Sequence, residues 1–250
     1  MITSGTFAPN AGALEKLLDA GEGPVIVLDP CGALWNTFFL TPRWSRLWQA
    51  WRLSPGQTQE GDVWNVINAL KGVNSIAGSS ALAAALFPAD HYSDLTRELM
   101  SSMLQFTDET NHVCDLPALA GQLWWAEELW ITIARWSRKY PNNSSLQTVR
   151  ALLTRDGASD SIKAIRSRMA TYHHPHVAET FSGASGLNLS TFRLRPGQII
   201  FLTPDIRSME NEELTDVYAF LLTSLQSIGA LHHVTFSMIE PALVAQGDVL

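Results

Sequence analysis

The chain is poor in cysteine and in positive charge. Its 250 residues include two cysteines, Cys31 and Cys114, whose wide separation supports neither a disulfide framework nor a zinc knuckle. We therefore expect two free thiols in a reducing compartment. Seventeen Lys and Arg stand against 24 Asp and Glu, a net charge of −7. The composition as a whole does not predict a protein whose main ligand is nucleic acid.

Long apolar runs are also missing. The longest apolar stretches, 78–88 and 116–134, are too short to cross a membrane or are interrupted by Gln122, Glu127 and Glu128. The N-terminus has neither the basic start nor the apolar centre of a secretory signal. We expect a soluble cytoplasmic protein that does not itself insert into a membrane.

What is present is an alternation of strand and helix patterns. Short runs rich in β-branched residues predict buried parallel strands at 24–29, 198–203 and 234–239. Amphipathic patterns at 11–20 and 211–229 predict helices beside them. This alternation is typical of an α/β fold with a parallel sheet. A further short strand is possible at 51–55.

A long helical segment interrupts the predicted sheet. About 165 residues separate the first two strands, far more than one crossover helix requires. Helical patterns within this segment cover 79–87, 92–106, 116–140, 144–153 and 159–178. We divide the chain into residues 1–70 as the first part of a core, 71–186 as an inserted all-α domain, and 187–250 as the second part of the core.

The N-terminal stretch SGTFAPNAGALEKLLDAGEGPVIVLDP has the loop, helix and strand layout of a phosphate-binding loop. A working loop, G-x-x-x-x-G-K-[ST], brings backbone N–H groups, a lysine and a metal-binding hydroxyl to the phosphates. Here the four fixed positions are Ser4, Pro9, Asn10 and Ala11. Pro9 has no N–H, Asn10 has no charge, and Ala11 has no hydroxyl. The loop predicts weak nucleotide binding at most.

The order of the segments resembles the type IV coupling proteins, the TraG/TraD-like ATPases of conjugation and type IV secretion. In that family a Walker A loop precedes a strand ending in an Asp-Pro-x-Gly turn, which Asp29, Pro30 and Gly32 match. An all-α domain then interrupts a RecA-like core, and the chain returns to a Walker B strand ending Asp-Glu. Ile239 and Glu240 occupy that position here. The resemblance implies a partial RecA-like, P-loop-type parallel sheet with an inserted all-α domain.

The resemblance also assigns site positions. Glu240 matches the Walker B carboxylate that orients the attacking water, whereas Ile239 cannot hold a magnesium shell. The metal side is thus lost at both Ala11 and Ile239. We expect no bound cofactor, ATP and Mg²⁺ binding only weakly if at all, and a pseudo-ATPase rather than an active enzyme. The degenerate nucleotide-site positions implied by the resemblance are Gly5, Thr6, Asn10, Ala11 and Asp29.

The family implies a role in handing substrates to a secretion channel. By resemblance, the all-α domain contacts relaxase, effector or secretion-system proteins, or DNA. The chain would oligomerise with itself or a related ATPase and reach the inner membrane through partners. Family members carry an N-terminal membrane anchor before the loop and further core strands after Walker B. Two alternatives stay open: a fragment of an active hexameric DNA-translocating ATPase, or a helical protein-binding adaptor without nucleotide.

Two further clusters of side chains each allow a structural and a functional interpretation. His173, His174 and His176, with Glu179, offer zinc-ligating groups, but Pro175 breaks the helix that would align them, which favours a solvated loop. Five cations between residues 150 and 168 indicate either a solvated helix surface with ion pairs or a face for DNA phosphates or an acidic partner. These cations are Arg150, Arg155, Lys163, Arg166 and Arg168.

Overall fold

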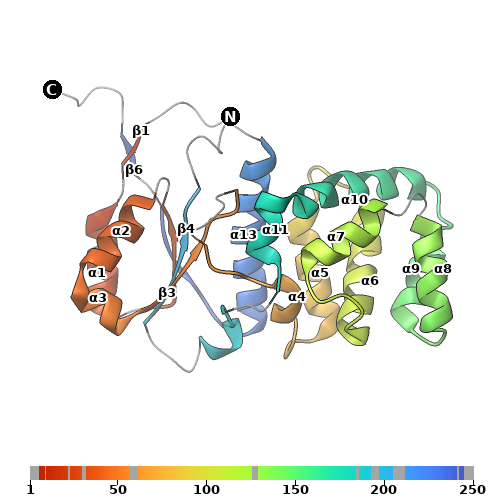
Figure 1. The fold of residues 1–250 in the computed structure, drawn as a ribbon, viewed down its shortest axis with the longest axis horizontal. Coiled ribbons are helices and arrows are strands. Elements are labelled where there is room, and N and C mark those ends of the chain that lie inside the picture. Colours follow the sequence, from red (N-terminus) through yellow and green to blue (C-terminus); the bar gives the residue numbers. More distant parts are fainter. Residues whose placement is uncertain are drawn as a thin grey trace. The chain divides into compact units, whose positions relative to one another are not determined.

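A computed structural model describes the chain as two compact units (Figure 1). The core unit comprises 1–62, 191–218 and 234–250, and the helical unit comprises 63–190 and 219–233. Within these spans the structure describes residues 6–8, 10–21, 23–29, 32–56, 61–125, 129–183, 186–192, 197–204, 212–240 and 242–244.

The core unit is built on a parallel sheet of four strands in the order β3-β4-β2-β5. Val27 in β2 lies opposite Phe201 in β4 on one side and Ile239 in β5 on the other. The three strands predicted from β-branched runs are therefore confirmed as parallel neighbours, and β3 confirms the possible fourth. The strands are β2 Val25–Leu28, β3 Gln49–Leu53, β4 Gln198–Leu202 and β5 Ser237–Ile239.

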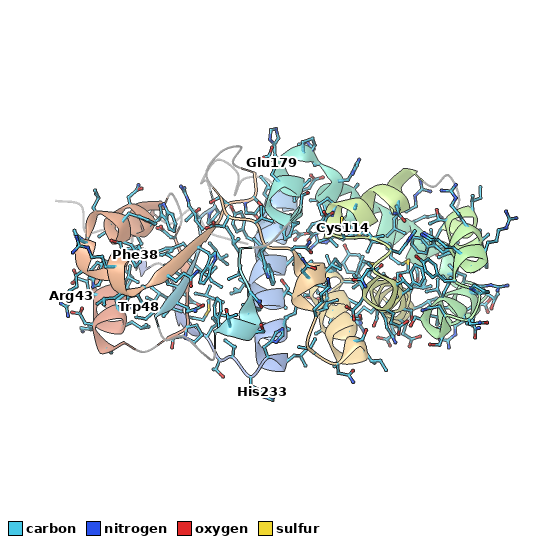
Figure 2. The ribbon with its side chains drawn as sticks, turned by 60° about the horizontal axis from the view of Figure 1, so that its bottom comes forward. Phe38, Arg43, Trp48, Cys114, Glu179 and His233 are labelled. Atoms are coloured by element: carbon cyan, nitrogen blue, oxygen red, sulfur yellow. The ribbon has the colours of Figure 1, made fainter. Side chains whose placement is uncertain are left out.

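Three helices of the core unit pack against one face of this sheet: α1 Ala11–Ala20, α2 Ala33–Leu40 and α3 Pro42–Leu47. Phe38 and Trp48 lie between these helices and the strands (Figure 2), in one buried cluster with side chains of β2 and β4. The sequence predicted α1 but not α2 or α3. Apolar residues fill six of the eight positions of the segment ALWNTFFL, so they do not form a single helical stripe.

A second, two-stranded sheet stands apart from the first in hydrogen bonding. Strand β1, Thr6–Ala8, pairs antiparallel with β6, Ala242–Val244. Neither strand is bonded to the four-stranded sheet. Residues 6–8 are thus extended, where the sequence predicts a loop.

The described residues of the helical unit form helices and connecting turns. Within it α5 packs on α6, α6 on α9, and α7 on α10. The domain limits at residues 70 and 186 remain a prediction. The helices are α4 Val66–Ala69, α5 Ser75–Leu86, α6 Asp94–Thr110, α7 Leu116–Trp125, α8 Leu129–Lys139, α9 Ser144–Leu152, α10 Ala158–His173 and α11 Pro175–Phe181.

Side-chain caps fix the starts of several of these helices. An oxygen of Asp115 accepts the N–H of Ala118 at 2.9 Å, and Asn143 accepts that of Leu146 at 2.9 Å. Each bond satisfies one of the orphan N–H groups of a first turn. The single helix predicted over 159–178 is two helices, because Pro175 cannot continue α10 and instead begins α11.

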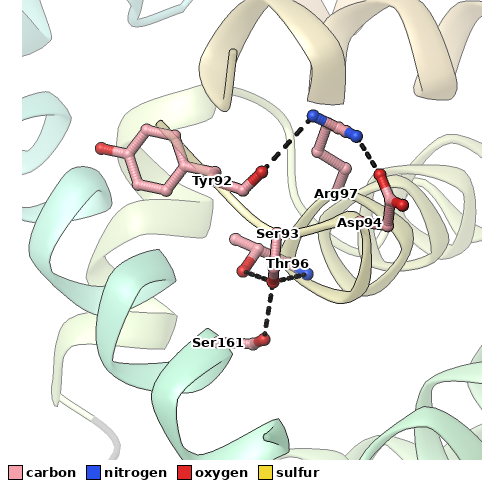
Figure 3. Close-up of polar contacts among 6 residues, drawn as sticks. All are labelled: Tyr92, Ser93, Asp94, Thr96, Arg97 and Ser161. Carbon is pink, nitrogen blue, oxygen red and sulfur yellow. Dashed lines mark hydrogen bonds and ion pairs between the residues drawn. The ribbon is translucent and has the colours of Figure 1, made fainter. Parts of the chain in front are cut away.

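The start of α6 is joined to α10 (Figure 3). The hydroxyl of Ser93 accepts the N–H of Thr96 at 3.2 Å and lies 3.4 Å from the hydroxyl of Ser161. Arg97 pairs with Asp94 one turn away on the same helix. A capping serine thus both begins α6 and contacts the helix that packs beside it.

One described helix, α13 Glu212–Leu231, is long and apolar enough to cross a membrane by length and composition alone. Its most apolar window has a mean hydropathy of 1.2. The core helix of a globular protein passes the same test, and Val217, Leu221 and Leu225 of the predicted apolar face are all buried.

Candidate nucleotide site at the carboxyl edge of the sheet

The first turn of α1 is capped by its own chain. Oδ1 of Asn10 accepts the N–H of Ala13 at 3.2 Å, and its carbonyl oxygen accepts the N–H of Leu14 at 3.2 Å. Asn10 stands where a phosphate loop has lysine, and Ala11, the first helical residue, stands where it has a hydroxyl. The N–H of Ala13, one of the first-turn groups that could otherwise face an anion, is therefore already bonded to the side chain of Asn10.

The segment before α1 has an extended backbone. Thr6 lies opposite Val244 and Ala8 opposite Ala242 in the antiparallel pair. A phosphate loop curls its N–H groups around the anion, whereas a paired strand directs them alternately to either side. Gly5 and Pro9 lie outside the described residues.

Asp29 joins the end of β2 to the start of α2. Its two carboxylate oxygens accept the N–H groups of Leu34 at 3.0 Å and Trp35 at 2.8 Å. Gly32, at φ +70°, turns the chain between them and donates its N–H to the Asp29 carbonyl oxygen at 3.0 Å. The Asp-Pro-x-Gly turn thus caps a helix, and this accounts for the residue types at Asp29 and Gly32.

Burial has the largest influence on the pKa of Asp29. Its side chain is 1% exposed, and burial raises the pKa of its carboxyl group above the ordinary value. The backbone N–H groups of Leu34 and Trp35, and the positive charge of Arg52, oppose that rise. The carboxylate is directed to the first turn of α2.

A second polar cluster lies at the carboxyl ends of β3 and β4. Arg52 donates through Nε to Oγ1 of Thr203 at 2.9 Å, and that hydroxyl also bonds to Ser54. The hydroxyl of Tyr218 lies 3.2 Å from the carbonyl oxygen of Thr203 and 3.1 Å from that of Pro55. Ligand sites of parallel sheets form at this edge. Sequence reasoning missed the cluster, and its one signal was the position of Thr203 directly after a buried strand.

Ile239 and Glu240, which the resemblance matches to Walker B, differ in exposure to solvent. Ile239 is 3% exposed and belongs to the buried cluster of the core unit. Glu240 follows it and is exposed. Because β5 runs parallel to β2 and beside it, Asp29 and Glu240 follow strands that end at the same sheet edge. Among the residues that the structure describes, no group of three or more His, Cys, Asp or Glu could hold a metal ion.

The remaining sequence candidates are placed as follows. His173 ends α10 and His176 lies in α11, so the histidines flank a helix break rather than fill a loop; the expected loop is wrong. The rings of His174 and His176 are 5.3 Å apart. Cys114 is a free, exposed thiol (Figure 2) whose pKa is raised by partial burial and by its bond to Asp115, which favours the unreactive protonated form.

Comparison with known proteins shows a similarity of fold. No protein-family model matches the chain, and no curated protein does. The bacterial conjugative coupling protein TrwBdeltaN70, in a trigonal form in complex with sulphate, matches with a TM-score of 0.54 and 14% identity over 87% of this chain and 48% of that one. Its unbound monoclinic form gives 0.53 and 13% over 93% and 61%. The chain thus spans about half to three fifths of those chains, and the similarity is one of mixed α/β fold.

Proposed function

We propose that this chain is a coupling-protein-like domain of a conjugation or type IV secretion system. Its role is to recruit or hand over a DNA or protein substrate, with nucleotide hydrolysis lost or severely weakened. The observation that carries the proposal is the fold similarity to a conjugative coupling protein over 87% of the chain. In this proposal the parallel sheet is a partial RecA-like core, and an all-α domain inserted at 71–186 contacts the substrate or its carrier proteins.

The proposed loss of hydrolysis rests on the chemistry at the sheet edge. Phosphoryl transfer in P-loop enzymes depends on a lysine at the phosphates and on a magnesium ion held by a hydroxyl and an aspartate. The matching positions here hold Asn10, which caps its own helix, the methyl group of Ala11, and the buried Ile239. Glu240 retains the type of side chain that the family uses at its position.

The test of this proposal is complementation by a variant that could not support hydrolysis. Phosphate release from ATP and Mg²⁺ by the purified chain is expected to stay at the buffer rate. In a conjugating host that encodes the chain, deletion of its gene should lower transfer, and Glu240→Gln should restore transfer as fully as the wild type. Transfer that the wild type restores and Glu240→Gln does not would show that hydrolysis is essential and overturn the proposal.

One observation favours a second candidate, a piece of an active motor. The chain aligns with 48% of the coupling-protein chain, so a larger assembly could supply the missing lysine and metal ligand. This candidate predicts phosphate release only when the chain is mixed with a full-length relative, and loss of that activity in Glu240→Gln. The plain helical adaptor is disfavoured, since β4, β2 and β5 are three adjacent parallel strands.

A further inference from the structure

One stretch of the helical unit is positively charged, whereas the chain as a whole is negatively charged. Residues 129–155 hold five of the 17 Lys and Arg and none of the 24 Asp and Glu. The stretch covers α8, the turn after it, α9, and the three residues that follow α9. The two helices pack against each other. In a chain with a net charge of −7, this hairpin is a local island of positive charge.

The solvent side of α8 combines these cations with apolar side chains. Leu129, Ile133 and Trp136 are buried, which fixes the opposite side outward. Trp130 is 44% exposed and Ile131 is 53% exposed, values high for side chains of this size. The α8 face is defined here as Trp130, Ile131, Ala134, Arg135 and Arg138, all exposed.

Helical spacing places these residues in one stripe. Ile131, Arg135 and Arg138 stand four and three residues apart, so their side chains are neighbours along the helix surface. The last turn adds Lys139, whose Nζ lies 5.2 Å from the ring of Tyr140. Trp130 and Ile131 begin the stripe and the guanidinium groups end it, over the roughly 16 Å length of an 11-residue helix.

The cations of this face lack carboxylate partners in the part of the chain that the structure describes. The ion pairs among the described residues include one between Arg155 and Glu98 at 3.0 Å. None of them includes Arg135, Arg138 or Arg150. Glu127 and Glu128 precede α8 in sequence, seven or more residues before Arg135. An ordinary solvated helix surface mixes both signs of charge, as the Lys163 and Asp160 pair of α10 does.

The charge pattern distinguishes between two kinds of acidic partner. A DNA duplex presents about one negative charge per 1.7 Å of axis, so a helix of this length would face about nine or ten charges with four or five cations. Duplex beyond the hairpin would meet a chain that is acidic elsewhere. A short acidic protein segment matches the hairpin in length and charge. Its apolar side chains would cover Ile131, which cannot stack on a base.

We propose that the α8 face binds a short acidic segment of a partner protein, with apolar side chains against Trp130 and Ile131 and carboxylates against Arg135 and Arg138. The proposal deepens the proposed function, on which it rests for its setting, by naming the partner class of the helical unit. Arginine suits this task because its planar guanidinium group bonds a carboxylate through two N–H donors.

The test is binding of a labelled peptide of Glu, Asp and Leu, about 12 residues long to match α8, to the full chain by fluorescence anisotropy. The wild type is expected to bind it more tightly than the same peptide with Gln and Asn in place of Glu and Asp. Added salt should weaken binding, since exposed charges are screened. Arg135→Glu with Arg138→Glu should weaken it about tenfold or more, and Trp130→Ser should weaken it to a lesser degree.

The matched control is Lys16→Glu with Arg46→Glu, the same change of charge at two exposed cations of the core unit. It is expected to bind within about twofold of the wild type. Far-ultraviolet circular dichroism shows whether each variant keeps its fold. The proposal is overturned if the acidic and neutral peptides bind alike, if the control weakens binding as much as the α8 variant, or if an oligonucleotide binds more tightly than the peptide. None of these outcomes depends on nucleotide hydrolysis or transfer, which test the proposed function separately.

Discussion

At the scale of single residues, Asp29 shows how a motif position can serve the fold. Both of its oxygens accept N–H groups from the first turn of α2, so the carboxylate holds a strand and a helix together. The sequence resemblance assigned the same residue to a nucleotide site. In the structure both oxygens of that carboxylate are used by the helix cap.

Replacing Asp29 should therefore destabilise the core unit. Asp29→Ala removes both acceptors and leaves the buried N–H of Leu34 and the partly buried N–H of Trp35 unpaired, with an expected loss of about 1–3 kcal/mol in the free energy of unfolding. Asp29→Asn keeps one acceptor and should cost less. Urea denaturation measures both. Asp19→Ala is the control, because that half-exposed carboxylate forms a surface pair with Arg43 worth at most about 1 kcal/mol. Equal losses for Asp29→Ala and the control would contradict the role of Asp29.

The buried position of Asp29 should make the free energy of unfolding depend on pH. Burial raises the pKa of Asp29 above its ordinary 3.8, so over that interval the folded chain binds more protons than the unfolded chain. Stability from this group is then greatest below the ordinary value and declines as pH rises through the folded pKa. The stability of the wild type relative to Asp29→Asn should accordingly fall as pH rises from about 4, then level off. A relative stability that rises with pH would mean that the folded pKa is lowered instead.

At the scale of elements, the sequence predicted what periodic patterns encode. The strands at 24–29, 198–203 and 234–239 were found because each is a continuous β-branched run. Helix α2 was missed because apolar residues fill six of its eight positions, and α3 was missed because its six residues include a single buried side chain, Trp44. Asp29 and Glu240 could be located because Asp29 ends one predicted strand and Glu240 directly follows another. The cluster of Arg52, Ser54 and Thr203 could not, since it joins strands about 150 residues apart and no local pattern records that pairing.

The turn into β4 gives a test at this scale. Gly197 has φ +77°, and a Cβ there would lie 2.8 Å from the carbonyl oxygen of Leu47. Gly197→Ala is expected to cost more than about 1 kcal/mol, because both the backbone conformation and the contact oppose it. Gly157→Ala is the matched control, with φ +82° but open space around the added methyl group. Thermal or urea unfolding of the two variants should rank Gly197→Ala as the less stable, and the reverse order would contradict this packing.

At the scale of the whole molecule, the fold of the chain and the chemistry of its proposed nucleotide site point in different directions. The four-stranded parallel sheet and its helices are similar in fold to a conjugative coupling protein. In the proposed alignment, the positions that the family uses on nucleotide hold a helix cap at Asn10, a methyl group at Ala11 and a core side chain at Ile239. The chain could keep the architecture because these replacements satisfy local hydrogen bonding and packing. The positive α8 face then stands as the feature through which the helical unit would act.

The most direct test of the central claim is isothermal titration of the full chain with ATP and Mg²⁺. A phosphate site without lysine or metal ligands should bind nucleotide with a dissociation constant no tighter than about 1 mM, and removal of Mg²⁺ should change nothing measurable. A dissociation constant in the micromolar range that weakens on removal of Mg²⁺ would show a working nucleotide site and contradict the account.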